Sequence, residues 1–137
     1  MAINTILLDT NAYSHYLAGD KHIEKLLIKA SAVFLSVVVI GELLVGYKEG
    51  TKEGKNRKYL QVFMDKPTVS VLPVTIETAE IFSSIFLQLK KEGRPIPVND
   101  LWIAAQTIET RSILISYDKH FRSVPNLRLW GGEKSLR

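Results

Sequence analysis

The stretch Thr5-Ile6-Leu7-Leu8-Asp9 decides the fold, because it predicts a short buried strand that ends in a carboxylate. Three other acids stand at comparable positions. Glu42 follows the apolar run 37–41, Asp118 follows the run 113–117, and Asp100 follows Pro97-Val98-Asn99 where a helix is expected to begin. Carboxylates so close to a core are costly unless something neutralises them, and no Lys or Arg directly flanks the first three acids along the chain. A hard divalent cation shared by several carboxylates would neutralise them. The sequence therefore predicts one acidic metal pocket.

Outward from this stretch, strand-like and helix-like segments alternate. Strands are expected at residues 5–8, 32–35, 69–74, 112–116 and 127–130. Helices are expected at 11–18, at 20–30 after a cap at Asp20, at 36–47, around 56–63, at 75–93 after a cap at Thr75, and from Asn99 or Asp100 onward. This alternation is typical of an α/β fold with a mainly parallel sheet of about five strands flanked by helices. We expect a single domain over residues 1–137, with 130–137 as a loose tail.

Composition narrows the class of protein. Of 137 residues, 46% are hydrophobic, which fits a globular core, and no apolar run reaches the roughly 20 residues of a membrane span. Cysteine is absent, so disulfides and thiolate metal sites are excluded, and a cytoplasmic location is expected. There are 18 Lys and Arg against 14 Asp and Glu. If four of the acids hold a metal, the rest of the chain has 18 basic residues and 10 acidic ones, an excess of positive charge that suits a polyanionic partner. An ordinary basic surface explains the composition equally well.

The four acids are expected to meet where parallel strands end and the next helices begin, because ligands of open parallel sheets gather at that edge. Each acid also has a purely structural interpretation, and these stay open individually. Asp9 and Asp100 can cap or begin a helix, and Asp118 can be a turn residue. Glu42 has apolar neighbours on both sides and lies near no cap or turn, so a structural role explains it least well. Taken together, the four positions favour the metal site.

The chemistry expected of such a pocket is hydrolysis of a phosphodiester. Carboxylates hold one or two Mg²⁺ or Mn²⁺ ions, which lower the pKa of bound water and stabilise charge at the phosphate. Thr10, Asn11 and Ser116 are candidates for orienting the carboxylates by hydrogen bonds. Lys119, Arg122 and Arg128, which follow Asp118 in the chain, are candidates for phosphate contacts. The three histidines, His15, His22 and His120, lack the spacing of a metal site, so we expect them at the surface or in the core. Trp102 and Trp130 are expected to serve in packing.

Four segments together resemble the PIN-domain signature, and specifically the VapC-type toxins of prokaryotic type II toxin–antitoxin systems. They are Leu7-Leu8-Asp9-Thr10-Asn11, residues 36–44 around Glu42, residues 99–105 beginning Asn99-Asp100-Leu101-Trp102, and residues 114–121 around Asp118. The family often carries threonine where this chain has Ser116, so the hydroxyl is kept.

This resemblance implies a PIN-like three-layer sandwich and a Mg²⁺- or Mn²⁺-dependent endoribonuclease whose acidic residues correspond to Asp9, Glu42, Asp100 and Asp118. It also implies a homodimer, inhibition by a cognate antitoxin, and binding of operator DNA through that antitoxin. Two alternatives remain. One is a PIN nuclease that acts in RNA processing or on DNA flaps without an antitoxin. The other is a receiver-like α/β switch built on Asp9 and a metal, which is disfavoured because it leaves Glu42 without a role.

Overall fold

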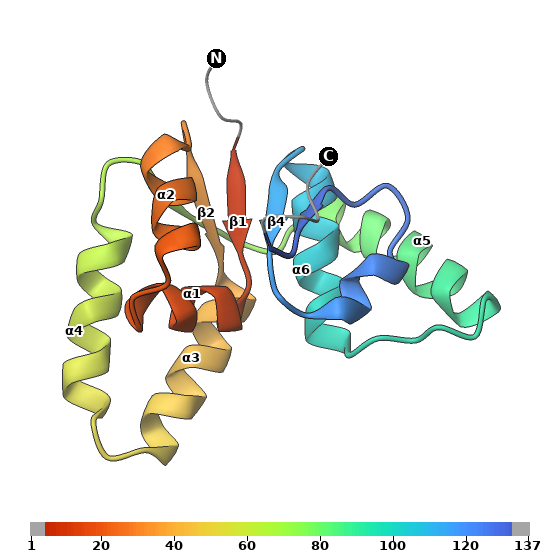
Figure 1. Ribbon diagram of the computed structural model, residues 1–137. Coiled ribbons are helices and arrows are strands. Elements are labelled where there is room, and N and C mark those ends of the chain that lie inside the picture. The colour runs from red at the N-terminus through yellow and green to blue at the C-terminus, as the bar shows by residue number, and fades with distance from the viewer. Residues whose placement is uncertain (1–4, 133–137) are drawn as a thin grey trace.

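A five-stranded parallel sheet forms the centre of the molecule in the computed structural model, which describes residues 5–132 (Figure 1). The strands are β1 (Ile6–Leu8), β2 (Val33–Ser36), β3 (Val69–Leu72), β4 (Ile113–Ile115) and β5 (Leu129–Trp130). Their order is β3-β2-β1-β4-β5, and each neighbouring pair is parallel. The central strands β1 and β4 are buried along their whole length, as strands covered on both faces should be.

Within residues 5–132, six α-helices flank the sheet and complete the α/β architecture. They are α1 (Thr10–Leu17), α2 (Lys21–Lys29), α3 (Val37–Glu49), α4 (Glu53–Met64), α5 (Ile76–Lys91) and α6 (Val98–Glu109). In Figure 1, α1 to α4 lie on one side of β1 and β4, whereas α5 and α6 lie on the other. The expected caps are present, because the side chains of Asp20 and Thr75 accept from the backbone N–H groups of Ile23 and Thr78. Gly19 and Gly93, with positive φ, follow the ends of α1 and α5.

The structure departs from the sequence prediction at several places. A short 3₁₀ helix, η1 (Lys119–Ser123), was not anticipated. Helix α4 begins at Glu53 despite Gly54, and Glu53 there accepts from Arg57 one turn later at 3.0 Å. Ile81 and Phe82 of α5 are only partly buried against the core. The predicted tail is wrong at its first residue, because Trp130 belongs to β5 and is 4% exposed. Residues 133–137 lie outside the described part of the chain.

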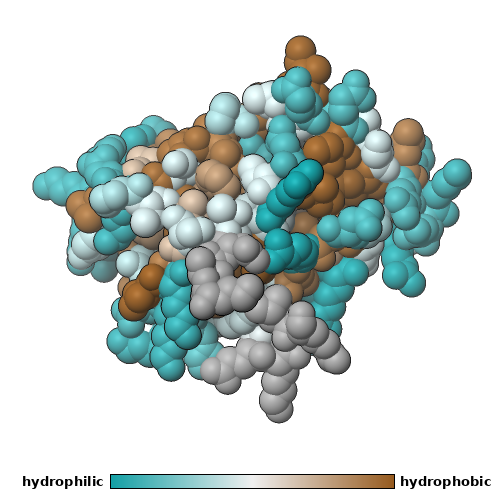
Figure 2. Space-filling view, turned by 90° about the horizontal axis from the view of Figure 1, so that it is seen from above, coloured by the Kyte–Doolittle hydropathy of each residue, from teal (hydrophilic) through white to brown (hydrophobic). Residues whose placement is uncertain are grey.

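Both tryptophans pack against other aromatic rings, as expected. Trp102 stacks on Phe82 with ring centroids 3.9 Å apart, and Trp130 packs against Tyr117 at 5.6 Å. Figure 2 shows the molecule from above, the end at which β1 begins, with hydrophilic side chains around much of the rim and hydrophobic ones in several separate patches. Within residues 5–132, no helix is both long enough and apolar enough to cross a membrane.

Candidate metal centre

The carboxyl ends of the parallel strands open into a cleft of about 490 Å³ in which the four predicted acids meet. Asp9 follows β1, Asp118 lies beyond β4, Glu42 comes from α3, and Asp100 lies in the first turn of α6. These positions span the chain, and the parallel topology brings them to one edge of the sheet. The residues lining the cleft are Asp9, Thr10, Asn11, Glu42, Pro97, Val98, Asn99, Asp100, Asp118 and His120.

Asp9 is the most deeply buried of the four acids, with 4% of its surface exposed. One carboxylate oxygen accepts from the backbone N–H of Ala12 at 2.7 Å and so caps α1. The other accepts from the hydroxyl of Ser116 at 2.5 Å. The same Ser116 oxygen accepts from the backbone N–H of Asp118 at 3.0 Å. Asp9 therefore caps α1 and also lies in the cleft. The Ser116 hydroxyl holds the Asp9 carboxylate next to the backbone of Asp118.

Glu42 is oriented by residues from two other helices. Thr10 of α1 donates its hydroxyl to Glu42 Oε1 at 2.5 Å, and Asn99 of α6 donates its side-chain N–H to Oε2 at 3.4 Å. Thr10 thus makes the kind of hydrogen bond to a carboxylate that the sequence suggested for it. Asn11 lines the cleft as well.

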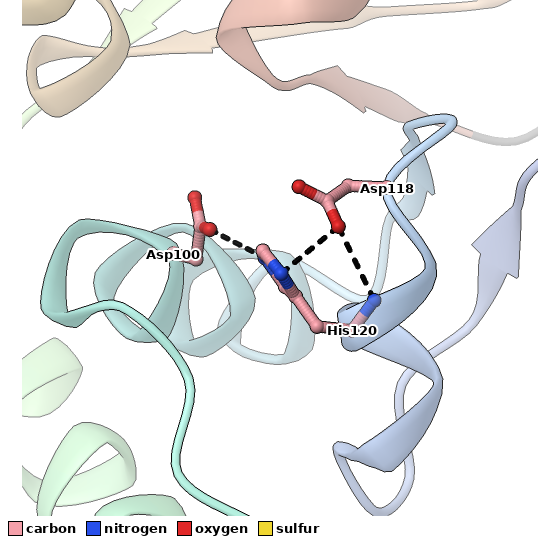
Figure 3. Close-up of side chains that lie close together, drawn as sticks. All are labelled: Asp100, Asp118 and His120. Atoms are coloured by element: carbon pink, nitrogen blue, oxygen red, sulfur yellow. Dashed lines mark hydrogen bonds and ion pairs between the residues drawn. The ribbon is translucent and has the colours of Figure 1, made fainter.

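Asp100, Asp118 and His120 form the tightest group of possible metal ligands in the described part of the chain, each offering one atom within 4.8 Å of the other two (Figure 3). His120 Nε2 lies 2.5 Å from Asp100 Oδ2, and Nδ1 lies 2.9 Å from Asp118 Oδ1. The prediction of a surface or core role for His120 did not anticipate that its ring lines the cleft and contacts two of the acids. Its position two residues after Asp118 was the available signal, because the spacing between histidines does not reveal a histidine that is grouped with distant carboxylates.

The acids of the cleft lie close together and are partly removed from water, which raises the pKa of two of them. Burial raises the pKa of the Asp9 carboxyl, and the charges of Asp100 and Asp118 raise it further, against the opposing hydrogen bonds from Ser116 and Ala12. Burial is also the main cause that raises the pKa of Asp100, which His120 opposes. Within residues 5–132, no Lys or Arg forms an ion pair with any of the four acids.

This set of groups fits a hard divalent cation. Carboxylate oxygens are the ligands that Mg²⁺ and Mn²⁺ prefer, and an ion would relieve the repulsion that the protein leaves uncompensated. A metal in the cleft is therefore chemically consistent with the donors present.

The basic residues proposed for phosphate contacts do not all lie at this edge. Lys119 and Arg122 lie on η1, directly after Asp118, and both are exposed. Arg128 precedes β5, and its guanidinium donates to the carbonyl of Arg111 just before β4. It therefore lies at the amino ends of the strands, the edge opposite the cleft. Nearness to Asp118 in sequence was misleading, because the chain crosses the molecule between η1 and β5.

Comparison with known proteins agrees with this fold. The PIN domain family model matches residues 6–127. Ribonuclease VapC of Rickettsia bellii is 32% identical over 100 residues, covering 70% of this chain and 73% of that protein. Ribonuclease VapC5 of Mycobacterium tuberculosis is 26% identical over 118 residues, covering 86% of both chains.

Among solved structures, VapBC2 from Rickettsia felis bound to a DNA fragment from its promoter contains a similar chain. The TM-score is 0.80 with 23% identity, covering 92% of this chain and 97% of that one. The five-stranded parallel sheet and the acidic cleft at its carboxyl edge are those of a PIN-domain nuclease fold. The chain belongs to the PIN-domain family, among the VapC ribonucleases.

Proposed function

We propose that this chain is a metal-dependent endoribonuclease toxin of a VapBC-type toxin–antitoxin system. One observation carries the proposal: four carboxylates from distant parts of the chain converge on one cleft, and no Lys or Arg of residues 5–132 neutralises them. The ribonuclease names of the similar proteins support RNA as the substrate.

In this proposal Asp9, Glu42, Asp100 and Asp118 hold one or two ions of Mg²⁺ or Mn²⁺. When bound, such an ion supplies an acidified water and stabilises charge at the scissile phosphate. Ser116 and Thr10 hold Asp9 and Glu42 in fixed orientations, so that their oxygens are already placed before metal arrives. Asn11, which lines the cleft, is proposed to orient a carboxylate or a bound water.

We further propose that Lys119 and Arg122 hold the RNA backbone next to the cleft. They are exposed cations on η1, whose N-cap is Asp118. Contacts of this kind position a phosphate without reading bases, so they would contribute affinity more than sequence preference.

A cognate antitoxin, a homodimeric state and promoter binding through the antitoxin complete the proposal. The similar Rickettsia felis chain, which was solved as VapBC2 bound to promoter DNA, supports the antitoxin and the promoter binding. The homodimer follows only from the family resemblance. The excess of basic residues over acids is also consistent with an acidic surface or nucleic acid as a partner.

Metal dependence tests the proposal. Purified protein, freed of metal with EDTA and dialysed, should leave a pool of tRNA and ribosomal RNA intact, and added Mn²⁺ or Mg²⁺ should restore cleavage. The cleavage products are separated on a denaturing gel. Cleavage at the full rate in EDTA would contradict a mechanism that depends on the four carboxylates.

Ser116 gives a second prediction, because its one hydroxyl connects Asp9 to the backbone at Asp118. Ser116→Ala should weaken Mn²⁺ binding about tenfold, the usual scale for removing a partner that orients a ligand. Isothermal titration calorimetry measures the affinity. Ser112→Ala is the matched control, since Ser112 is equally buried at the other end of β4 and bonds Thr5 and Thr110. Equal losses in both variants would show a general loss of packing and contradict the assigned role.

A further inference from the structure

His120 differs from the other residues of the cleft because its ring contacts two acids that come from different elements. Asp100 lies on α6 and contacts Nε2 at 2.5 Å, whereas Asp118 precedes η1 and contacts Nδ1 at 2.9 Å (Figure 3). The backbone N–H of His120 also donates to Asp118 Oδ1 at 3.3 Å. The imidazole is thus held between the two carboxylates, and its side chain remains 31% exposed toward solvent.

The spacing of the three residues suits a shared ion. One donor atom from each of Asp100, Asp118 and His120 lies within 4.8 Å of the other two. Around an octahedral ion with bonds of about 2.1 Å, neighbouring ligands are about 3 Å apart and opposite ones about 4.2 Å. The three donors therefore lie close to the separations that ligands of one shared ion have.

The side chains of Asp100, Asp118 and His120 are the ones in the cleft that can adjust most easily, because hydrogen bonds to other residues hold the remaining two acids in place. Both oxygens of Asp9 accept from Ser116 or Ala12, and both oxygens of Glu42 accept from Thr10 or Asn99. The hydrogen bond of Asp100 in the described part of the chain is to His120 itself. An ion that entered between Asp100 and Asp118 would meet the imidazole directly.

From this geometry we infer that His120 supplies a nitrogen ligand to the metal, together with Asp100 and Asp118, and that this nitrogen favours Mn²⁺ over Mg²⁺. The inference rests on the proposed metal-dependent function. Imidazole is a good ligand for transition metals, whereas Mg²⁺ prefers oxygen and gives up its waters reluctantly. A site of two carboxylates and one imidazole therefore binds Mn²⁺ more tightly than a purely carboxylate site of the same charge.

The test is electron spin echo spectroscopy of Mn²⁺ bound to the whole protein, which detects a directly coordinated nitrogen independently of activity. The wild type should show ¹⁴N modulation, and His120→Asn should lose it. The matched control is His15→Asn, which removes an exposed histidine on α1 that packs against Tyr117. This control should keep the modulation.

Calorimetric titration of the same proteins tests the preference between metals. His120→Asn should weaken Mn²⁺ binding about tenfold and change Mg²⁺ binding less than about twofold. Bound Mn²⁺ without ¹⁴N modulation in the wild type would overturn the inference and leave His120 as a residue that only positions the two acids. An equal loss for both metals would overturn the preference. If the wild type binds neither metal, the proposed function fails as well, so the two failures are distinguishable.

Discussion

Asp9→Asn is expected to lower metal-dependent RNA cleavage about 100-fold or more while making the metal-free protein more stable. The loss follows because the neutral amide removes one charge from the proposed metal site, and a bound ion contributes several kcal/mol to stabilisation of the reacting phosphate. Cleavage rates are measured on the same RNA at saturating Mn²⁺. Activity within a few-fold of wild type would contradict the proposed role of Asp9.

The gain in stability has a separate cause. Burial raises the pKa of Asp9 in the folded protein, so the unfolded chain loses its proton first as the pH rises. Stability therefore falls between the ordinary aspartate pKa and the raised folded value, and the penalty persists at neutral pH. Asparagine avoids it, because its oxygen can still accept from Ala12 and its amide can donate to Ser116.

Chemical denaturation in EDTA measures this effect. At pH 7 the variant should be more stable by about 1 kcal/mol, a typical gain when a functional residue is replaced by a structurally better one. The difference should shrink below pH 4, where the wild-type carboxyl becomes protonated in both states. A variant less stable than the wild type at pH 7 would show that the Asp9 charge is already compensated within the protein.

Glu42→Gln is expected to lower cleavage roughly 10- to 100-fold with little change in folding, since a neutral amide is a weaker ligand for a hard cation. The side chain is half-buried and held by Thr10 and Asn99, and glutamine can keep one contact to each. Single-turnover cleavage at fixed Mn²⁺ is the measurement.

Glu49→Gln is the matched control for Glu42→Gln. Glu49 lies on the same helix, is exposed, and does not line the cleft. The control removes the same charge from α3 and should cleave RNA at the wild-type rate. Equal losses in the two variants would point to the overall charge of the helix and not to a ligand at position 42.

The sheet and the meeting of the four acids could be predicted from sequence because both follow from simple patterns. Short apolar runs predicted the strands, and carboxylates at their ends predicted the edge where ligands gather. Parallel pairing then brought Asp9, which follows β1, and Asp118, which lies beyond β4, to the same edge. The hydroxyl of Ser116 was within reach of Asp9 for the same reason.

The features that were missed depend on the path of the chain between elements. His120 enters the cleft because Asp118 begins a 3₁₀ turn, which places a residue two positions later beside its own carboxylate. Arg128 lies at the opposite edge of the sheet because the same segment then crosses to the start of β5. The pairing of Trp130 with Ile115 joins residues that are distant in sequence, so the predicted strand 127–130 did not by itself show which neighbour it would pair with.

The central claim is that the carboxylates of one cleft hold the metal on which RNA cleavage depends. Its most direct test measures Mn²⁺ occupancy and cleavage rate on the same samples as metal is titrated into wild type and Asp9→Asn. The rate should rise in proportion to occupancy in the wild type and stay at least about 100-fold lower in the variant at equal occupancy. A wild-type rate that does not depend on occupancy, or an equal rate in the variant, would contradict the claim.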